Sequence, residues 1–241
     1  RERWHRIAML ASERRWAGRF RWMMGGSRML LQAARLSVID YSRAMVRDGL
    51  TVGTSGNVSA REGQHIAITP TGVAYDELTP DMITVIDMDG NRVDGSLKPS
   101  SEVPMHLLVY RETDARAVVH THPLYATALG LIADETPLVH YTLAMCGGPV
   151  RVAPYATYGT PELAEKVRAA MAGRSAVLLR NHGATSWGAS LNDAYTKSVY
   201  LEWTCRLWFV ARSVGDPHLL NAMEFRDAAD KIADYGRQDD C

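Results

Sequence analysis

Cysteine is scarce in this chain of 241 residues, and the three that it contains form no paired motif. Cys146, Cys205 and Cys241 are odd in number and widely spaced, a pattern that argues against a disulfide framework and favours a reducing compartment. The chain also lacks an apolar run long enough to span a bilayer. We therefore expect a cytoplasmic protein that has no membrane partner.

An excess of either charge is also missing, because 27 basic residues balance 27 acidic residues. This balance gives no general support for a nucleic-acid partner. Internal repeats, low-complexity blocks and interdomain linkers are absent as well, and neither the Walker phosphate loop nor the Rossmann glycine spacing occurs. A chain of this length without a linker is predicted to fold mainly as one large domain.

The first 28 residues differ in composition from the rest of the chain. They contain eight arginines, three tryptophans and two acidic residues, with a Gly-Gly-Ser break at residues 25–27. An arginine-rich, acid-poor segment is typical of a transit peptide or of an arm that binds nucleic acid. We divide the chain into an Arg- and Trp-rich N-terminal extension, residues 1–28, and one domain, residues 29–241. Binding of nucleic acid by the extension stays an alternative to our expectation of no such partner.

Apolar periodicity and turn residues predict a mixture of helices and short strands from residue 31 onward. The predicted helices span residues 31–48, 100–110, 123–131, 160–171, 191–214 and 223–235. The predicted strands span residues 58–60, 65–69, 83–87, 92–93, 117–122, 176–179 and 184–187. Thr79-Pro80 also carries the signals of a helix start. Because regular βαβ spacing is missing, we expect an α/β (α+β) three-layer sandwich, with a central, mainly antiparallel sheet and helices on both faces.

Two histidines end the strand predicted at residues 117–122. His120 and His122 are two residues apart, so in an extended strand their side chains point to the same face. His182 follows the strand predicted at residues 176–179 and offers a third imidazole. Three histidines with an open position form the ligand set of a catalytic zinc site. The alternative is that the three histidines bind no metal and are merely polar or half-buried side chains.

Three of the loops between the predicted helices and strands are rich in glycine and in residues with hydroxyl groups. They are Gly-Thr-Ser-Gly-Asn at residues 53–57, Thr-Pro-Thr-Gly at residues 69–72 and Pro-Ser-Ser-Glu at residues 99–102. Glycine lets a backbone approach a ligand closely, and the N–H groups of such turns and of helix starts bind anions. We interpret the three loops as one phosphate cradle. Ordinary turns, and helix capping by Ser100 or Ser101, are the alternatives.

Glu102 is the candidate acid–base residue. A carboxylate beside a metal ion and a bound phosphate can take a proton from a carbon atom next to a polarised carbonyl group. The alternative role of Glu102 is purely electrostatic, because the helix dipole stabilises an acidic side chain at a helix start.

The motifs Gly-Thr-Ser-Gly-Asn-Val-Ser, Ile-Thr-Pro-Thr-Gly, Pro-Ser-Ser-Glu, Val-Val-His-Thr-His and Asn-His-Gly occur in this order, which resembles the class II aldolase/adducin family. The resemblance covers about residues 31–235. It implies one Zn²⁺ per subunit, bound by His120, His122 and His182, with Glu102 as a base that also contacts the metal. The phosphate-binding residues that it implies are Thr54, Gly56, Asn57, Thr71, Gly72, Ser100 and Ser101.

The same resemblance implies a homotetramer with active sites at the subunit interfaces. In such an assembly Tyr141 would reach into a neighbouring subunit's site as a proton donor. Tyr158 would lie at that interface, and Tyr235 would belong to a mobile tail. Packing in the core or at the interface is the alternative role for these three aromatic residues.

The activity that the resemblance implies is zinc-dependent, reversible aldol cleavage of a ketose 1-phosphate, such as L-fuculose 1-phosphate or a similar deoxyketose. The products would be dihydroxyacetone phosphate and a small aldehyde. Pentulose-phosphate 4-epimerases of the family carry Asp where this chain has Glu102, and oxo-tetronate-phosphate decarboxylases carry Lys where it has Ser101. Both residues therefore favour an aldolase. These two activities, a methylthioribulose-phosphate dehydratase and a non-catalytic adducin-like interaction domain stay as alternatives.

Overall fold

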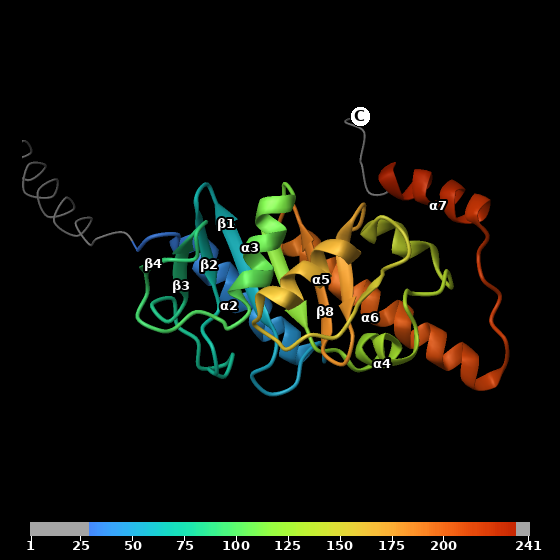
Figure 1. Cartoon of the computed structure of the whole chain (residues 1–241), viewed down its shortest axis with the longest axis horizontal. Helices are drawn as coiled ribbons and strands as arrows, with labels where there is room; N and C mark the ends of the chain where they lie inside the picture. The colour runs from blue at the N-terminus through green and yellow to red at the C-terminus, as the bar shows by residue number, and fades with distance from the viewer. Residues whose placement is uncertain (1–28, 235–241) are drawn as a thin grey trace, which may run out of the picture.

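The computed structural model describes residues 29–234, in which helices cover both faces of a central sheet (Figure 1). The N-terminal extension, Tyr235 and Cys241 lie outside the described residues. The sheet has eight strands in the order β4-β3-β2-β1-β5-β8-β7-β6. All neighbouring strands are antiparallel except β6 and β7. The predicted sandwich with a mainly antiparallel sheet is confirmed.

Alternation along the strands assigns side chains to the two faces of the sheet. The strands are β1 (Asn57–Glu62), β2 (His65–Ile68), β3 (Thr84–Asp87), β4 (Arg92–Asp94), β5 (Ala117–Thr121), β6 (Val152–Ala153), β7 (Ala176–Leu179) and β8 (Gly183–Gly188). On β5, Ala117 and Val119 pack into one buried cluster, and Val118 packs into the cluster on the opposite face. His120 follows Val118 with the same period of two, so it points to the face of Val118.

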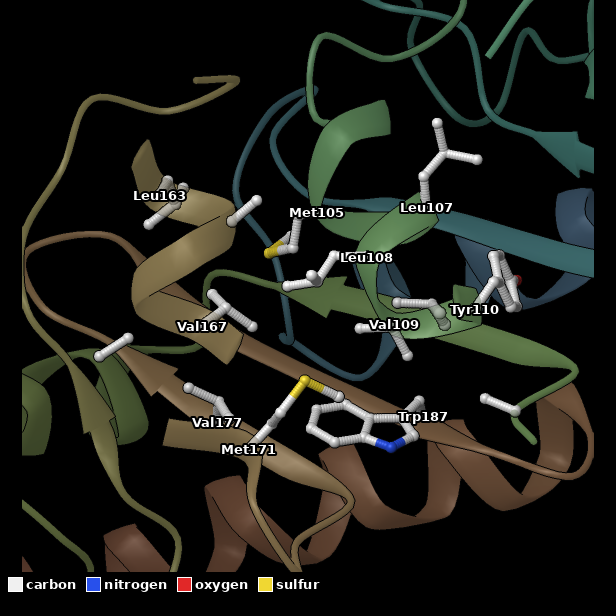
Figure 2. Close-up of a cluster of buried hydrophobic side chains, with 14 of the residues drawn as sticks. Met105, Leu107, Leu108, Val109, Tyr110, Leu163, Val167, Met171, Val177 and Trp187 are labelled. Carbon is white, nitrogen blue, oxygen red and sulfur yellow. The ribbon is translucent and has the colours of Figure 1, made fainter. Parts of the chain in front are cut away.

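Two groups of helices bury these faces. One face is covered by α2 (Gln32–Arg47), α4 (Leu124–Ile132), the 3₁₀-helix η1 (Tyr141–Cys146) and α6 (Leu191–Val214). The other is covered by α3 (Val103–Glu112) and α5 (Pro161–Met171), and α7 (Ala222–Asp234) packs against η1. Figure 2 shows the cluster between α3, α5 and the sheet, which includes Met105, Leu108, Val167 and Trp187. Within residues 29–234 no helix has both the length and the apolar character needed to cross a membrane.

Helix α5 illustrates how local sequence fixes these elements. Thr160 Oγ1 accepts a hydrogen bond from the Leu163 amide at 3.3 Å, and Pro161 occupies the first helical position. Leu163 and Val167 then recur with helical spacing and are buried against the sheet. Each such side chain stabilises the fold by about 1.5–3 kcal/mol when it leaves water.

The helix start predicted at Thr79-Pro80 is wrong. The segment forms a single turn, in which the Met82 amide donates to the Thr79 carbonyl at 3.0 Å. The buried Arg35 guanidinium donates to the carbonyl groups of Pro80 and Ile83, at 2.9 and 2.7 Å. These carbonyl groups are engaged by a side chain instead of helical amides, and the chain continues directly into β3.

Candidate metal centre

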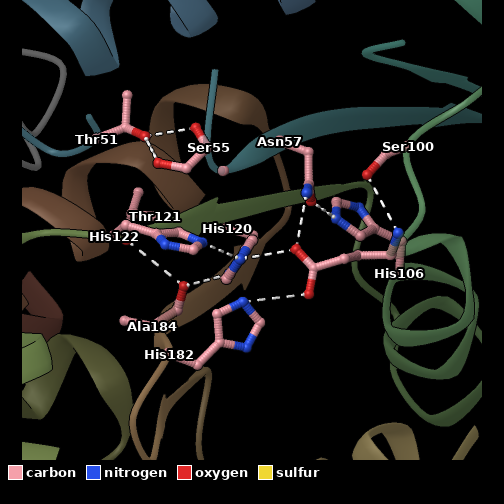
Figure 3. Close-up of polar contacts among 12 residues, drawn as sticks. Thr51, Ser55, Asn57, Ser100, His106, His120, Thr121, His122, His182 and Ala184 are labelled. Carbon is pink, nitrogen blue, oxygen red and sulfur yellow. Dashed lines mark hydrogen bonds and ion pairs between the residues drawn. The ribbon is translucent and has the colours of Figure 1, made fainter. Parts of the chain in front are cut away.

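Three imidazoles and one carboxylate converge at the end of β5 (Figure 3). Glu102, His120, His122 and His182 each offer one ligand atom, and these four atoms lie within 4.8 Å of one another. The ring centroids of the three histidines are 4.7, 4.8 and 4.9 Å apart. The structure therefore brings together all four residues that the sequence predicts as metal ligands.

Pairing between strands sets the position of His120. It pairs with Asn57 of β1 on one side and with Thr185 of β8 on the other. Its Nδ1 donates a hydrogen bond to the carbonyl oxygen of Ala184 at 2.9 Å, which turns Nε2 toward the other ligands. A bond of this kind is the usual outer support of a metal-binding histidine. A one-residue slip in either register would move the imidazole to the opposite face.

Tight turns bring the other two histidines next to His120. His122 comes directly after the last residue of β5, and His182 lies in the turn between β7 and β8. In that turn Asn181 has a φ of 56°, in the left-handed region that asparagine tolerates. A Cβ atom at Gly183 would collide with the carbonyl oxygen of Thr121, so this turn reaches β5 because the residue is glycine.

Glu102 approaches from the helix layer, as the N-cap residue of α3. Its Oε2 lies 2.8 Å from His120 Nε2, and its Oε1 lies 3.4 Å from His182 Nε2. Asn57 Nδ2 donates to Oε2 at 3.0 Å, and the Glu102 amide donates to Ser100 Oγ at 3.2 Å. Ser100 therefore binds the amide of the N-cap residue and does not itself cap the helix, and the carboxylate faces the imidazole rings.

Burial and mutual charge set the protonation of the centre. Burial, together with the charges of the other two histidines, lowers the pKa of His122 to about 3, and burial with the charge of His120 lowers the pKa of His182 to about 4. Burial favours the protonated form of Glu102, but His120 outweighs it and holds the pKa of the carboxyl well below its usual range. Burial also opposes protonation of His120, yet the Glu102 carboxylate raises the pKa of that ring. At neutral pH the centre thus contains an ionised carboxylate and two neutral imidazoles.

This donor set fits a divalent cation. His120 Nε2 lies 2.9 Å from His122 Nε2 and 2.8 Å from Glu102 Oε2, so electron-rich atoms face one another. Within the described part of the chain, Glu102 Oε1 is buried without a hydrogen-bond partner. A metal ion satisfies such an atom, whereas an unpaired buried oxygen is costly. Imidazole nitrogens with a carboxylate oxygen are the ligands that Zn²⁺ and similar transition metals prefer.

A cavity of about 370 Å³ opens beside the ligands and brings the three predicted loops together. Its lining includes all seven residues predicted to bind phosphate, which are Thr54, Gly56, Asn57, Thr71, Gly72, Ser100 and Ser101. Glu102, His122 and His182 line the same cavity. A Cβ atom at Gly56 would lie 2.7 Å from the carbonyl oxygen of His120, so glycine allows the first loop to lie against β5.

The three predicted aromatic residues fall in different places. Tyr158 lines this cavity and is 65% exposed. Tyr141 begins η1, is 47% exposed and borders a second hollow with residues of α7. The structure does not bring Tyr141 to the cavity of its own chain among the residues that it describes. Tyr235 lies outside the described residues.

One buried polar residue near the centre, His106, was not among the predicted site residues. His106 lies one helical turn after Glu102 on α3, and its ring is fully buried. Its Nε2 lies 2.5 Å from Asn57 Oδ1, and its Nδ1 lies 2.7 Å from Ser59 Oγ. The four-residue spacing from Glu102 places both side chains on one face of a helix, and this spacing is the sequence signal that points to it.

Comparisons with known proteins show the family of this chain. The family model described as Class II Aldolase and Adducin N-terminal domain matches residues 37–209. The 5-deoxy-D-ribulose 1-phosphate aldolase of Bacillus thuringiensis serovar kurstaki is 39% identical over 213 residues, which cover 87% of this chain and 100% of that protein. The L-fuculose phosphate aldolase of Escherichia coli K12 is 38% identical over 202 residues, which cover 83% of this chain and 94% of that protein. A solved structure of an L-fuculose 1-phosphate aldolase matches with a TM-score of 0.82 at 39% identity, covering 86% of this chain and 100% of that one.

Proposed function

This chain belongs to the class II aldolase/adducin family, as its motifs predicted, and we propose that, as a class II aldolase, it reversibly cleaves a ketose 1-phosphate with the help of Zn²⁺. The products would be dihydroxyacetone phosphate and a small aldehyde. The observation that carries this proposal is a cluster of four candidate metal ligands, three of which (Glu102, His122 and His182) line a cavity bordered by three glycine- and hydroxyl-rich loops. One end of this site suits a cation and the other suits a phosphate, and a ketose 1-phosphate carries its carbonyl group next to the carbon that bears the phosphate.

Zn²⁺ would be held by His120, His122 and His182, with Glu102 as a fourth ligand before substrate binds. When bound, the cation supplies a Lewis acid that polarises a carbonyl group and stabilises the negative charge that develops beside it. An electron sink of this kind removes the need for a lysine that forms a Schiff base with the substrate.

Glu102 is positioned to move the proton at the carbon atom that cleavage leaves electron-rich. Its carboxyl group is ionised at neutral pH, because the neighbouring His120 holds its pKa well below the usual range despite burial. The carboxylate lines the cavity, so a substrate carbon can come within its reach. A general base placed in this way contributes about 10²–10⁴-fold to the rate.

The phosphate group would be bound by neutral donors. Among the described residues that line the cavity, none is lysine or arginine. Hydroxyl groups and the backbone N–H groups of glycine turns can hold an anion without a fixed positive charge. A phosphate held in this way orients the whole sugar, so that binding remote from the reaction places the reacting carbons.

We extend the proposal to a homotetramer in which Tyr141 of one subunit exchanges a proton with the aldehyde oxygen in the site of its neighbour. Tyr141 is 47% exposed and lies apart from the cavity beside its own metal ligands, which supports this assignment. Tyr158, which lines the cavity and is also exposed, would lie where the two subunits meet. A cytoplasmic location belongs to the same proposal, since Cys146 and Cys205 are buried and free.

The relatives differ in the sugar that they are named for, 5-deoxy-D-ribulose 1-phosphate in one case and L-fuculose phosphate in the other. We propose a deoxyketose 1-phosphate of this kind, L-fuculose 1-phosphate among them. The complete cluster of ligands argues against a non-catalytic adducin-like domain, and glutamate at position 102 argues against an epimerase.

The deciding experiment measures the release of dihydroxyacetone phosphate from a series of ketose 1-phosphates. The full chain is stripped of metal with a chelator, dialysed and reloaded with Zn²⁺. We expect no release without metal and full release after reloading. Equal release by the stripped protein would contradict the role of the metal, and no release from any ketose 1-phosphate by the loaded protein would contradict the aldolase activity.

A further inference from the structure

A series of hydrogen-bonded, buried polar groups leads from the interior of the fold to the metal centre, and Figure 3 shows the end of it at the metal centre, with Asn57 and His106. Tyr110 Oη lies 2.7 Å from Ser59 Oγ, which lies 2.7 Å from His106 Nδ1. His106 Nε2 lies 2.5 Å from Asn57 Oδ1, and Asn57 Nδ2 lies 3.0 Å from Glu102 Oε2. All five residues are buried. The series therefore ends on the carboxylate that faces the three imidazoles.

Two elements supply this series with matching periods. Glu102, His106 and Tyr110 follow one another at intervals of four residues along α3, so they lie on one face of the helix. Asn57 and Ser59 are two residues apart on β1, so they lie on one face of the strand. The polar side chains of the helix and the strand therefore alternate along the contact between them.

Chemistry fixes the direction of each hydrogen bond. The Glu102 carboxylate only accepts, so Asn57 Nδ2 donates to it and Asn57 Oδ1 faces His106. Because Oδ1 also only accepts, His106 Nε2 carries the hydrogen atom. Both partners of this ring are uncharged and burial lowers the pKa of His106 to about 3, so the ring is neutral and its Nδ1 accepts from the Ser59 hydroxyl. The Tyr110 hydroxyl then donates to Ser59.

We propose that His106 is a positioning residue, which holds the Asn57 amide in the orientation that donates to Glu102. The inference rests on the proposed function, in which Glu102 is both a metal ligand and a base. Without the Nε2 donor the amide can turn, and its oxygen would then face the carboxylate and repel it. Removal of an outer partner of this kind lowers metal affinity or activity by about 10–100-fold.

The same series of hydrogen bonds limits the donor and acceptor groups of Asn57 that are free to contact a substrate. Its side-chain oxygen is engaged by His106, and one amide hydrogen is engaged by Glu102. The second amide hydrogen and the backbone are left for the cavity that Asn57 lines. Asn57 thus connects the phosphate loop to the metal ligand, in addition to any contact that it makes with phosphate.

Two substitutions at position 106 test whether the Nε2 donor of His106 is required, or whether any buried polar side chain at this position is sufficient. In His106→Gln the amide reaches as far as Nε2 does and can still donate to Asn57. In His106→Asn it reaches only as far as Nδ1, so the bond to Asn57 is lost. The Zn²⁺ affinity of each full-length variant is measured by competition with a chromophoric chelator. We expect a loss of about 10–100-fold for His106→Asn and an affinity close to that of the wild type for His106→Gln.

A double-mutant cycle tests whether His106 acts through Asn57. In an Asn57→Ala background, His106→Asn should change the Zn²⁺ affinity no further, because the bond that it removes no longer exists. Losses that simply add would overturn the proposal. Ser59→Ala and Ser42→Ala form a matched pair of controls, since both serines are fully buried and only Ser59 belongs to the series. We expect only Ser59→Ala to lower the affinity.

Nitrogen NMR of the imidazoles tests the tautomer without metal or substrate. His106 should carry a hydrogen atom on Nε2 and none on Nδ1, with the signal identified by its loss in His106→Gln. A hydrogen atom on Nδ1 alone would overturn the proposal. If the wild type binds no Zn²⁺, the proposed function fails and the NMR result still decides on His106. If the wild type binds Zn²⁺ and both variants at position 106 weaken it equally, the inference alone fails.

Discussion

Two regions of this chain are built in different ways. We call the four candidate metal ligands and the elements that carry them the metal end, and η1 with its first residue Tyr141 the Tyr141 end. At the metal end, paired strands, tight turns and the start of α3 hold four ligand atoms within 4.8 Å of one another. At the other end, the Tyr141 ring lies on a short 3₁₀-helix, stacks on His140 with ring centroids 4.2 Å apart and is 47% exposed. Strand register restrains the first group of side chains, whereas the second depends on the packing of η1 against α6 and α7.

This difference indicates a division of labour in the proposed enzyme. In the proposed tetramer, one chain would complete the half of the site that binds metal and phosphate, and the half that meets the aldehyde would come from another copy. A defect at the metal end should then be irreparable within its own subunit, whereas a defect at Tyr141 should be repaired by a neighbour.

The largest effect should follow from His120→Ala. This change removes the ligand that contacts both Glu102 and His122, and it leaves the buried carboxylate without its closest partner. We expect Zn²⁺ binding and cleavage both to fall to background, as measured by chelator competition and by release of dihydroxyacetone phosphate. His65→Ala is the matched control, because this half-buried histidine begins β2 outside the cluster. Wild-type zinc affinity in His120→Ala would show that the cluster is not the metal site.

Glu102→Gln should separate metal binding from proton transfer at the same end of the molecule. Three imidazoles still hold the cation, but the carboxylate that accepts a proton is gone, so we expect a loss of about 10²–10⁴-fold in proton exchange. The measurement is deuterium uptake into dihydroxyacetone phosphate at saturating Zn²⁺. Glu112→Gln, at the exposed end of the same helix, is the control and should exchange normally. Normal exchange in Glu102→Gln would remove this residue from its role.

Mixing two inactive variants tests the division directly. Tyr141→Phe subunits keep intact metal ligands, and His120→Ala subunits keep an intact Tyr141. In a mixed oligomer some interfaces combine a sound metal centre with a sound tyrosine, so we expect part of the cleavage activity to return after the two proteins are unfolded and refolded together. The same proteins refolded separately are the control. If no activity returns, each chain contains a complete site and no division of labour between subunits exists.

The smallest effect concerns how firmly η1 is held. Burial raises the pKa of Cys146, the last residue of η1, to about 12, so the reactive thiolate is scarce at pH 8. We expect alkylation of Cys146 in the native protein to be far slower than in the unfolded protein, as followed by mass spectrometry of its peptide. Cys205, buried in α6, is the internal reference. Fast labelling of Cys146 alone would show that η1 opens, and the two ends would then differ in mobility as well.

The sequence predicted that the candidate metal ligands lie together because its signals there are local. The spacing of His120 and His122 predicted that both rings lie on one side of the chain where a strand ends, although His122 itself comes directly after the last residue of β5. The glycine- and hydroxyl-rich loops are visible in the same way, and the order of the motifs indicated the family. The exposed phenol of Tyr141 carries no periodic signal, so only the resemblance to the family predicted a position for it.

Contacts between elements were beyond the reach of sequence patterns. The hydrogen bond from His106 to Asn57 exists because one face of α3 lies against one face of β1. The residue spacing within the helix does not predict which strand it packs against, and the spacing within the strand does not predict the helix. The helix start predicted at Thr79 is wrong for the same reason, because Arg35, far away in sequence, engages the carbonyl groups of that turn. Local preference was outweighed there by a buried tertiary hydrogen bond.

The order of events during folding follows from where the ligands lie. The donors come from the start of α3, the end of β5 and the turn before β8, so an unfolded chain presents only scattered imidazoles. A cation therefore gains its full set of bonds only when the central strands have closed. Zinc added during refolding should leave the rates of the early folding steps unchanged and should instead slow the unfolding of the native state.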